Sequence, residues 1–256
     1  MSLDAIPLWI ILLATIGLVL LALQAGVRLG TRRRRRGTAK LEVSGAMVGA
    51  TMGLLAFMLA FTFNAAAGRH EARKKLVIEE ANAIETTWLR AGFLQEPRRV
   101  AMRELLRTYV NVRVKVAFGQ VSLADGLHHT EELHDKMWAL AVESGHAEPG
   151  SIAIGLFVQS LNQVIDLHLE RLTVAVRNRV PFTIWTTLYV VMFIGMFMMG
   201  AQIGQGETRH PGTEIALAVS FSLVLLMIAD LDRPQQGLVR VSQQAMMDVQ
   251  SKLDSR

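Results

Sequence analysis

The chain has 256 residues, a formal net charge of +5 and a mean hydropathy of +0.32. It contains no cysteine, which excludes disulfide bridges, haem thiolate ligation and cysteine-based zinc sites. Hydrophobic residues make up 51% of the chain and gather in long uncharged runs, so these numbers favour an integral membrane protein.

Four apolar runs are long enough to cross the ~30 Å hydrocarbon core of a bilayer as helices. They cover about residues 6–27, 43–67, 181–204 and 213–230. Backbone polar groups in lipid must be satisfied within the segment, so runs of this length predict helices rather than open strands. The first run has an alternative as a removed signal peptide. Its arginines follow the apolar stretch and it lacks a small-residue cleavage site, so we expect a retained span.

The spans divide the chain into an all-α arrangement with a domain inserted between spans two and three. We expect a first transmembrane hairpin over 1–67, a helical water-facing domain over 68–180, a second hairpin over 181–230 and a C-terminal amphipathic helix over 231–256. Within the domain, apolar residues recur with the 3.6-residue helical period. They predict helices to about Leu94, over Arg98–Phe118, from about Leu123 through Val142, and from near Pro149 up to Pro181.

The loop after the first span is strongly basic, with Arg28, Arg32 to Arg36 and Lys40. One interpretation is a topology signal attracted to anionic lipid headgroups. The other is an arm that binds nucleic acid or a protein partner. No aromatic interleaving or nucleic-acid motif accompanies the arginines, so we favour the first and expect no nucleic-acid partner. The opposite face is also basic near the membrane, so charge counting leaves the orientation open.

The second span begins with three glycines at four-residue spacing, Gly45, Gly49 and Gly53. Small residues at this spacing let helices approach closely, either within one subunit or between subunits around an axis. Farther along lie Leu54, Phe57, Met58 and Phe61. These side chains either pack against lipid and core, or they form a hydrophobic constriction of a pore that gates by dewetting.

Polar residues follow the phenylalanines as the span leaves the membrane. The candidates for a pore exit or vestibule are Asn64, Arg69, Arg73, Glu79, Glu80 and Asn82. A plain solvated helix face is the alternative, with Lys75 and Glu79 paired four residues apart.

The fourth span closes with Asp230, Asp232, Arg233 and Pro234. These residues form either an ordinary interfacial anchor or ion pairs with the basic segment Arg69–Lys75, if the two lie on one face. The run His128–His134 is too isolated to predict a metal site, and no catalytic motif is present. We therefore expect no metal, no cofactor and no enzyme activity.

Two segments together resemble a bacterial membrane family described as bestrophin-like, whose function is unknown. The first carries Phe61, Phe63, Arg69, Arg73, Glu80, Ala81, Asn82, Ala83, Ile84 and Arg90; the second carries Asp230, Asp232, Arg233, Pro234 and Gly237. The resemblance covers about residues 41–250. It implies a multi-pass protein of the bacterial inner membrane, with the helical domain and the C-terminus in the cytosol.

More distantly the chain is similar to bestrophins, which are pentameric anion channels with four spans per subunit and a phenylalanine-bearing neck on the second span. The acidic calcium-clasp segment of animal bestrophins has no counterpart here, so calcium gating is not implied. In bestrophins the first loop faces outward, which fits poorly with the arginine run.

Two main hypotheses follow. The first is a homo-oligomeric ion channel with the second span around a central pore. The resemblance slightly favours anions, and potassium or other cations stay open because the spans contain no basic residue. The second is a membrane-anchored scaffold or sensor that conducts nothing.

Overall fold

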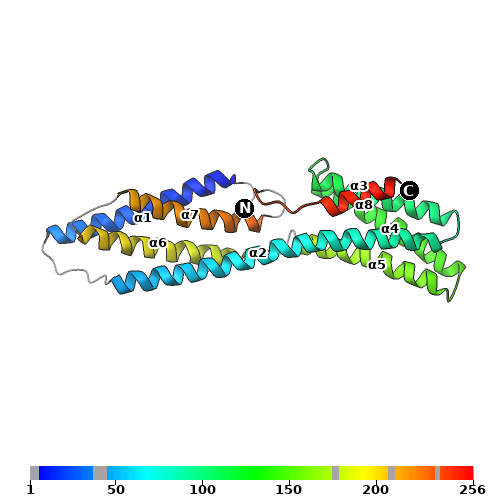
Figure 1. Ribbon diagram of the computed structural model, residues 1–256, viewed down its shortest axis with the longest axis horizontal. Helices are drawn as coiled ribbons and strands as arrows, with labels where there is room; N and C mark the ends of the chain where they lie inside the picture. Colours follow the sequence, from blue (N-terminus) through cyan, green and yellow to red (C-terminus); the bar gives the residue numbers. More distant parts are fainter. Residues whose placement is uncertain (1–5, 37–44, 175–178, 207–210, 234–236, 256) are drawn as a thin grey trace. The chain divides into compact units, whose positions relative to one another are not determined.

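The computed structural model describes residues 6–36, 45–174, 179–206, 211–233 and 237–255. These residues are helical with no strand among them, which confirms the all-α prediction (Figure 1). The chain divides into two compact units. Unit 1 contains Met1–His70 and Arg179–Arg240, and unit 2 contains Glu71–Asn178 and Val241–Arg256.

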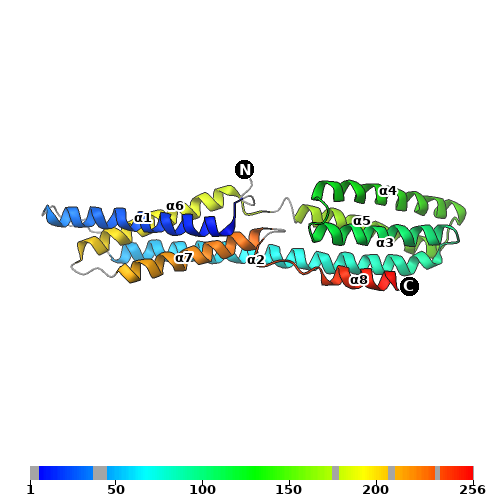
Figure 2. The same ribbon diagram turned by 90° about the horizontal axis from the view of Figure 1, so that it is seen from above.

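Unit 1 is built from α1 (Leu8–Arg35), the first part of α2 (Gly45–Arg90), α6 (Phe182–Gln205) and α7 (Pro211–Asp232). In both views these helices run alongside one another, and α1 packs on α6 and α7 (Figure 2). The core of unit 1 is apolar, with Leu23, Leu59, Leu188, Met192 and Leu225 among its buried members.

The contact between α1 and α6 is made by glycines on both helices. A Cβ atom at Gly26 or Gly30 would meet backbone atoms of α6, and one at Gly200 or Gly204 would meet backbone atoms of α1. Each pair has the small-x-x-x-small spacing that lets membrane helices approach closely. Close packing in this unit therefore uses glycines other than the row on the second span.

Unit 1 has two distinct ends. At the first, Arg233 Nη2 donates to the Ile6 carbonyl at 2.5 Å, and the Val180 amide donates to Asp232 Oδ1 at 3.0 Å. We call this the Asp232 end; the chain passes to unit 2 from it. At the other, Arg34 Nη1 donates to the Gly206 carbonyl at 2.5 Å. We call this the arginine end.

Unit 2 contains the remainder of α2, the 3-10 turn η2 (Ala91–Phe93), α3 (Arg98–Ala117), α4 (Leu123–Ala147), α5 (Ile152–Leu172) and α8 (Gln244–Asp254). Side chains cap two of these helices. Ser122 Oγ accepts the Asp125 amide at 3.1 Å, and Ser151 Oγ accepts the Ile154 amide at 3.4 Å. Such N-caps satisfy amides that have no partner inside the helix.

The core of unit 2 is apolar and draws on all of its helices. Its largest buried side chains include Trp88, Tyr109, Met137, Phe157 and Leu161. Two arginines cover the Trp88 ring, with the Cζ atoms of Arg103 and Arg107 at 5.2 and 5.1 Å from its centroid. The predicted helical domain is therefore a bundle with a core of its own.

Five helices among the described residues are long and apolar enough to cross a membrane: α1, α2, α5, α6 and α7. The sequence predicts four spans and assigns α5 to the water-facing domain. In unit 2, α5 buries one apolar side in the core and exposes a mixed side, on which polar residues outnumber the exposed Ile152, Leu156 and Leu169. The exposed polar side chains are Gln159, Asn162, Gln163, Asp166 and Glu170.

Two predicted element bounds need correction. Helix α1 continues through the arginine run to Arg35, because arginine is a good helix former and cations are favourable at a helix C-terminus. The C-terminal amphipathic helix begins at Gln244 and excludes Leu238 and Val241. The amides of Leu238 and Val239 instead bind the Asp230 carboxylate.

Candidate functional site

Helix α2 presents an exposed face in unit 1 that carries the phenylalanines. Phe57 is 69% exposed, Phe61 is 67% exposed and Leu54 is 52% exposed. They occupy positions i, i+3 and i+7, so they share one side of the helix. The opposite side is buried in the core of unit 1 through Leu55 and Leu59.

The same exposed face is rich in small residues. Gly49 and Gly53 are exposed, and a Cβ atom at either would meet nothing within 4 Å. Gly45 differs, since its Cβ would lie 3.2 Å from Nε2 of Gln202. The other helices of unit 1 also expose large apolar side chains. These include Trp9 and Leu21 on α1, Val190, Phe193 and Ile194 on α6, and Leu223 and Met227 on α7.

Beyond the phenylalanines, the exposed side of α2 becomes polar. Asn64 is exposed in unit 1, and Asn82, 18 residues or five helical turns later, is exposed in unit 2. Between them the exposed or half-exposed charges pair along the helix. Lys74 Nζ lies 3.6 Å from Glu71 Oε1, and Lys75 Nζ lies 3.5 Å from Glu79 Oε1.

Four predicted site residues lie elsewhere on α2. Met58 is partly buried against the core of unit 1. Arg69 Nε lies 3.5 Å from Asp232 Oδ1, the ion pair that the sequence left open. Arg73 is 5% exposed and Glu80 is fully buried. The prediction that Arg73 and Glu80 line a vestibule is therefore corrected, because the bundle covers their side of the helix.

Glu80 is the centre of a buried polar cluster in unit 2. Tyr109 Oη donates to Oε1 at 2.5 Å, and Arg113 Nε lies 3.1 Å from the same oxygen. Arg171 Nη1 donates to Oε2. The carboxylate thus joins α2 to α3 and α5, and Arg171 also reaches Gln243 Oε1, just before α8, at 3.5 Å.

The charges of the cluster determine the protonation state of the carboxylate. Burial alone raises the pKa of Glu80, but the Arg113 and Arg171 charges, together with hydrogen bonds from Tyr109 and Arg171, lower it to about 2. Burial and the Glu80 charge raise the pKa of Tyr109 well above its usual value. Glu80 is therefore ionised and Tyr109 neutral at physiological pH.

Two histidines border this cluster. The His134 and His168 rings are 5.2 Å apart, and they lie 5.3 and 6.4 Å from the Tyr109 ring. Burial lowers the pKa of His134 to about 4. Burial and the Arg113 charge lower the pKa of His168 to about 3. Both imidazoles are neutral at pH 7, so Glu80 is the only anion that offsets the two arginines within this group.

The sequence analysis missed this cluster, although one signal for it is present. Glu80 lies four residues after Leu76 and four before Ile84, so the helical period puts it on the apolar side of α2. Its partners come from separate helices far along the chain. The arrangement acts as a structural clamp, because the carboxylate is saturated with donors and fully covered.

The motif after the fourth span forms a second polar cluster, in unit 1. Asp230 Oδ1 accepts the Leu238 amide at 2.7 Å, and Oδ2 accepts the Val239 amide at 2.9 Å. A Cβ atom at Gly237 would collide with the Asp230 carboxylate, which explains the glycine. Asp232 and Arg233 tie down the segments before α6 and α1. Pro234 lies outside the described residues.

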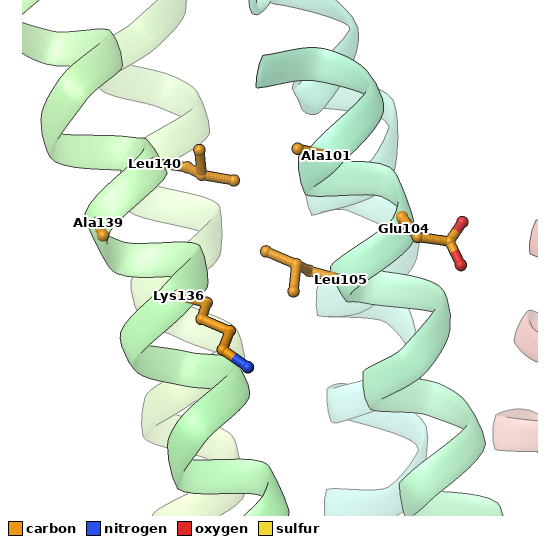
Figure 3. A pocket seen from close by; sticks show the side chains of 6 residues that line it. All are labelled: Ala101, Glu104, Leu105, Lys136, Ala139 and Leu140. Atoms are coloured by element: carbon orange, nitrogen blue, oxygen red, sulfur yellow. The ribbon is translucent and has the colours of Figure 1, made fainter. Parts of the chain in front are cut away.

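Two other surface features carry few polar groups that could bind a ligand. His128 Nδ1 lies 3.3 Å from Glu132 Oε1 on the exposed side of α4, and the described residues contain no group of three or more candidate metal ligands. An open groove of about 450 Å³ lies between α3 and α4 (Figure 3). Apolar side chains such as Leu105 and Leu140 line it, with Glu104 on one helix and Lys136 on the other.

Comparison with known proteins supports a single family. The bestrophin-like domain matches residues 11–246. No curated protein matches the chain. The crystal structure of a mutant bacterial bestrophin homolog from Klebsiella pneumoniae superposes with a TM-score of 0.68 and 13% sequence identity, over 96% of this chain and 98% of that one. At 13% identity this structural likeness shows a common fold and nothing more, whereas the bestrophin-like domain matches most of the sequence. The chain therefore belongs to the bestrophin-like family.

Proposed function

We propose that the protein is a homo-oligomeric ion channel of the bacterial inner membrane, with the exposed face of α2 lining a shared central pore. In this proposal α1, the first part of α2, α6 and α7 cross the bilayer. Helix α5 does not cross, because its exposed side carries Asp166, Glu170 and three amides beside a few apolar side chains, and its buried side belongs to the core of unit 2. A water-facing amphipathic helix has this pattern.

The observation that carries the proposal is the pair of open glycines, Gly49 and Gly53, on the exposed face of α2. Side chains that face lipid are typically large and apolar, as on α1, α6 and α7. Open glycines such as Gly49 and Gly53 instead suit close approach of another helix. Four spans are too few to enclose a roomy conduit in one chain, so the neighbouring helix would come from another copy around a closed axis.

Leu54, Phe57 and Phe61 would then form the narrowest part of the pore. Rings of apolar side chains restrict ion flow by excluding water. Met58 contributes to packing instead, because it lies against the core of unit 1. Asn64, Glu79 and Asn82 stay as candidates for the wider exit, with Glu71 and Lys75 added by their exposure.

In this proposal the charges at the pore exit determine whether the channel prefers anions or cations. Glu71 and Glu79 offset Lys74 and Lys75 on this part of α2, so these four residues give no strong preference for either sign. The resemblance to bestrophins favours anions, and we propose that anions carry the larger share of the current. A reversal potential measured across a KCl gradient decides between anions and potassium.

The test of oligomeric packing uses the absence of native cysteine. Gly53→Cys introduces a single thiol on the exposed face of α2, and we expect it to cross-link between copies in membranes. Ile194→Cys is the matched control, because this residue is on the exposed side of α6. Cross-linking of the control alone would contradict the proposed axis.

The test of conduction uses the purified protein in planar bilayers. Replacing Phe57 and Phe61 by alanine should raise basal conductance several-fold, because the ring that excludes water is removed. Phe193→Ala removes an exposed phenylalanine of α6 and should leave the current unchanged. Equal currents in all variants would remove the constriction. Complete absence of current from the wild-type protein would favour a non-conducting scaffold, for which the α3–α4 groove is the candidate docking surface.

A further inference from the structure

The arginine end of unit 1 presents an exposed cluster of cations. Arg32, Arg34, Arg35 and Arg36 are exposed at the C-terminal end of α1. Arg34 is anchored to the Gly206 carbonyl and Thr31 Oγ1 donates to the Gly204 carbonyl at 3.3 Å, so α6 holds this part of α1 in place. The helix is continuous through these residues, which places several guanidinium groups around a single turn.

Most of the cations that flank the spans on the other side are buried or paired within the protein. Arg69 pairs with Asp232, and Arg233 is buried and bound to the Ile6 carbonyl. Within unit 2, Arg73 is buried, Arg171 binds Glu80, and Lys74 and Lys75 pair with glutamates. Arg240 is exposed. Far less free positive charge is therefore presented by the described residues on this side than by the arginine end.

The distribution of lysine and arginine among the short loops also favours a cytosolic location of the arginine end. Seven lysines and arginines lie between Arg28 and Lys40, and Arg209 lies in the short segment that joins α6 to α7. The positive-inside rule gives weight to short loops and little to a long domain such as 71–178. Cytosolic leaflets also carry the anionic lipids that attract exposed basic segments.

We propose that the arginine end of unit 1 binds the anionic headgroups of the cytosolic leaflet. The Asp232 end, from which the chain passes to unit 2, then faces away from the cytosol. This orientation is opposite to the one that the resemblance to bestrophins implies. It is independent of conduction, because either orientation is compatible with a pore.

The first test locates two sites on the full chain with single cysteines. Ser255→Cys is exposed near the C-terminus, and Arg36→Cys is exposed at the arginine end. In spheroplasts, a membrane-impermeant maleimide should label the thiol at 255 at once, and the thiol at 36 only after the membrane is permeabilised. Labelling of position 36 alone in intact spheroplasts would overturn the orientation.

The second test asks whether anionic lipid binds at this end. The purified protein is compared in vesicles of phosphatidylglycerol and of phosphatidylcholine, and we expect a higher unfolding temperature in phosphatidylglycerol. Replacing Arg32, Arg34, Arg35 and Arg36 by glutamine should abolish that difference. The control Lys74→Gln/Lys75→Gln also removes exposed cations and should keep it. An equal unfolding temperature of the wild-type protein in both lipids, or loss of the difference only in the control, would overturn the binding surface.

Discussion

The two units bury charged groups in different places. In unit 1 the buried acidic side chains lie near helix ends, Glu214 in the first turn of α7 and Asp230 and Asp232 in the last. Its middle is held by apolar side chains and by glycine contacts between α1 and α6. In unit 2 an ionised carboxylate, Glu80, lies inside the bundle with two arginines.

The difference is the one expected if unit 1 faces lipid and unit 2 faces water, as proposed above. A charge in the middle of a bilayer is costly, and helices in lipid associate through close packing of small residues. A water-facing bundle is driven by burial of apolar area, and it tolerates an ion cluster that is fully hydrogen-bonded. The contrast therefore supports the assignment of unit 1 to the membrane and unit 2 to water.

The largest test of this contrast removes the buried anion. Glu80→Ala leaves Arg113 and Arg171 without their carboxylate inside unit 2. Breaking a buried ion pair from one side costs about 3–5 kcal/mol, so we expect a loss of that order. Amide hydrogen exchange on the full chain measures the loss of stability separately for the two units, and protection against exchange should fall in unit 2.

The neighbouring residue supplies the control. Glu79→Ala removes a half-exposed carboxylate that pairs with Lys75 along the helix. Pairs of this kind contribute at most about 1 kcal/mol. If both alanine variants lost similar small amounts of protection, Glu80 would not be the clamp described above.

The next test addresses the packing of unit 1. A Cβ atom at Gly200 would collide with the backbone of Leu23, whereas one at Gly17 would meet nothing within 4 Å. Alanine is preferred to glycine within a helix by about 1 kcal/mol. We therefore expect Gly200→Ala to lower the thermal unfolding temperature in detergent and Gly17→Ala to keep or raise it. Equal shifts of the same sign would show that α1 and α6 are not in backbone contact.

A smaller effect is expected at the Asp232 end. Asp230→Ala removes the acceptor of the Leu238 and Val239 amides. Loss of such bonds costs about 1–3 kcal/mol, and water reaches this exposed segment, so we expect a value near the lower limit. Asp248→Ala is the control, because that exposed-side carboxylate accepts a hydrogen bond from the Gln244 side chain within α8. Thermal unfolding of the two variants gives the comparison, and a larger loss in the control would contradict the account.

Much of the architecture is predictable from local pattern. Long uncharged runs locate the helices of unit 1, and the 3.6-residue period locates the helices of unit 2, with the start of α5 expected near Pro149 and found at Ile152. The tie between Arg69 and Asp232 is one of the alternatives that the sequence left open. The helix positions depend on residues that are close together in the sequence or on long runs of apolar composition.

The parts that were missed depend on contacts between distant segments. Adjacent glutamates look alike in the sequence, yet Glu79 is half-exposed and Glu80 is buried, because they lie 100° apart around the helix. Tyr109, His134 and Arg171 meet around Glu80 only once α3, α4 and α5 pack together. The glycine contact between α1 and α6 was not predicted either, because Gly26 and Gly200 meet only when two segments far apart in the chain pack together.

The mildest test of the contrast uses pH, because the titratable cluster belongs to unit 2. The pKa values of His134 and His168 are lowered to about 4 and 3 in the folded protein, against 6.5 for an ordinary histidine. Between these values the unfolded chain binds more protons, so stability is highest above pH 6.5 and falls as the pH decreases. Glu80, Arg113, Asp135 and Arg171 surround the imidazoles, and lowering of the Glu80 pKa to about 2 adds a loss of stability in the same direction below pH 4.5.

From pH 7 to 5.5 we expect a modest loss of hydrogen-exchange protection, corrected for intrinsic exchange, in unit 2 and little change in unit 1. His168→Gln should flatten this dependence, whereas His128→Gln, on the exposed side of α4, should keep it. A pH dependence that is equal in both units would mean that the histidine pair is not its source.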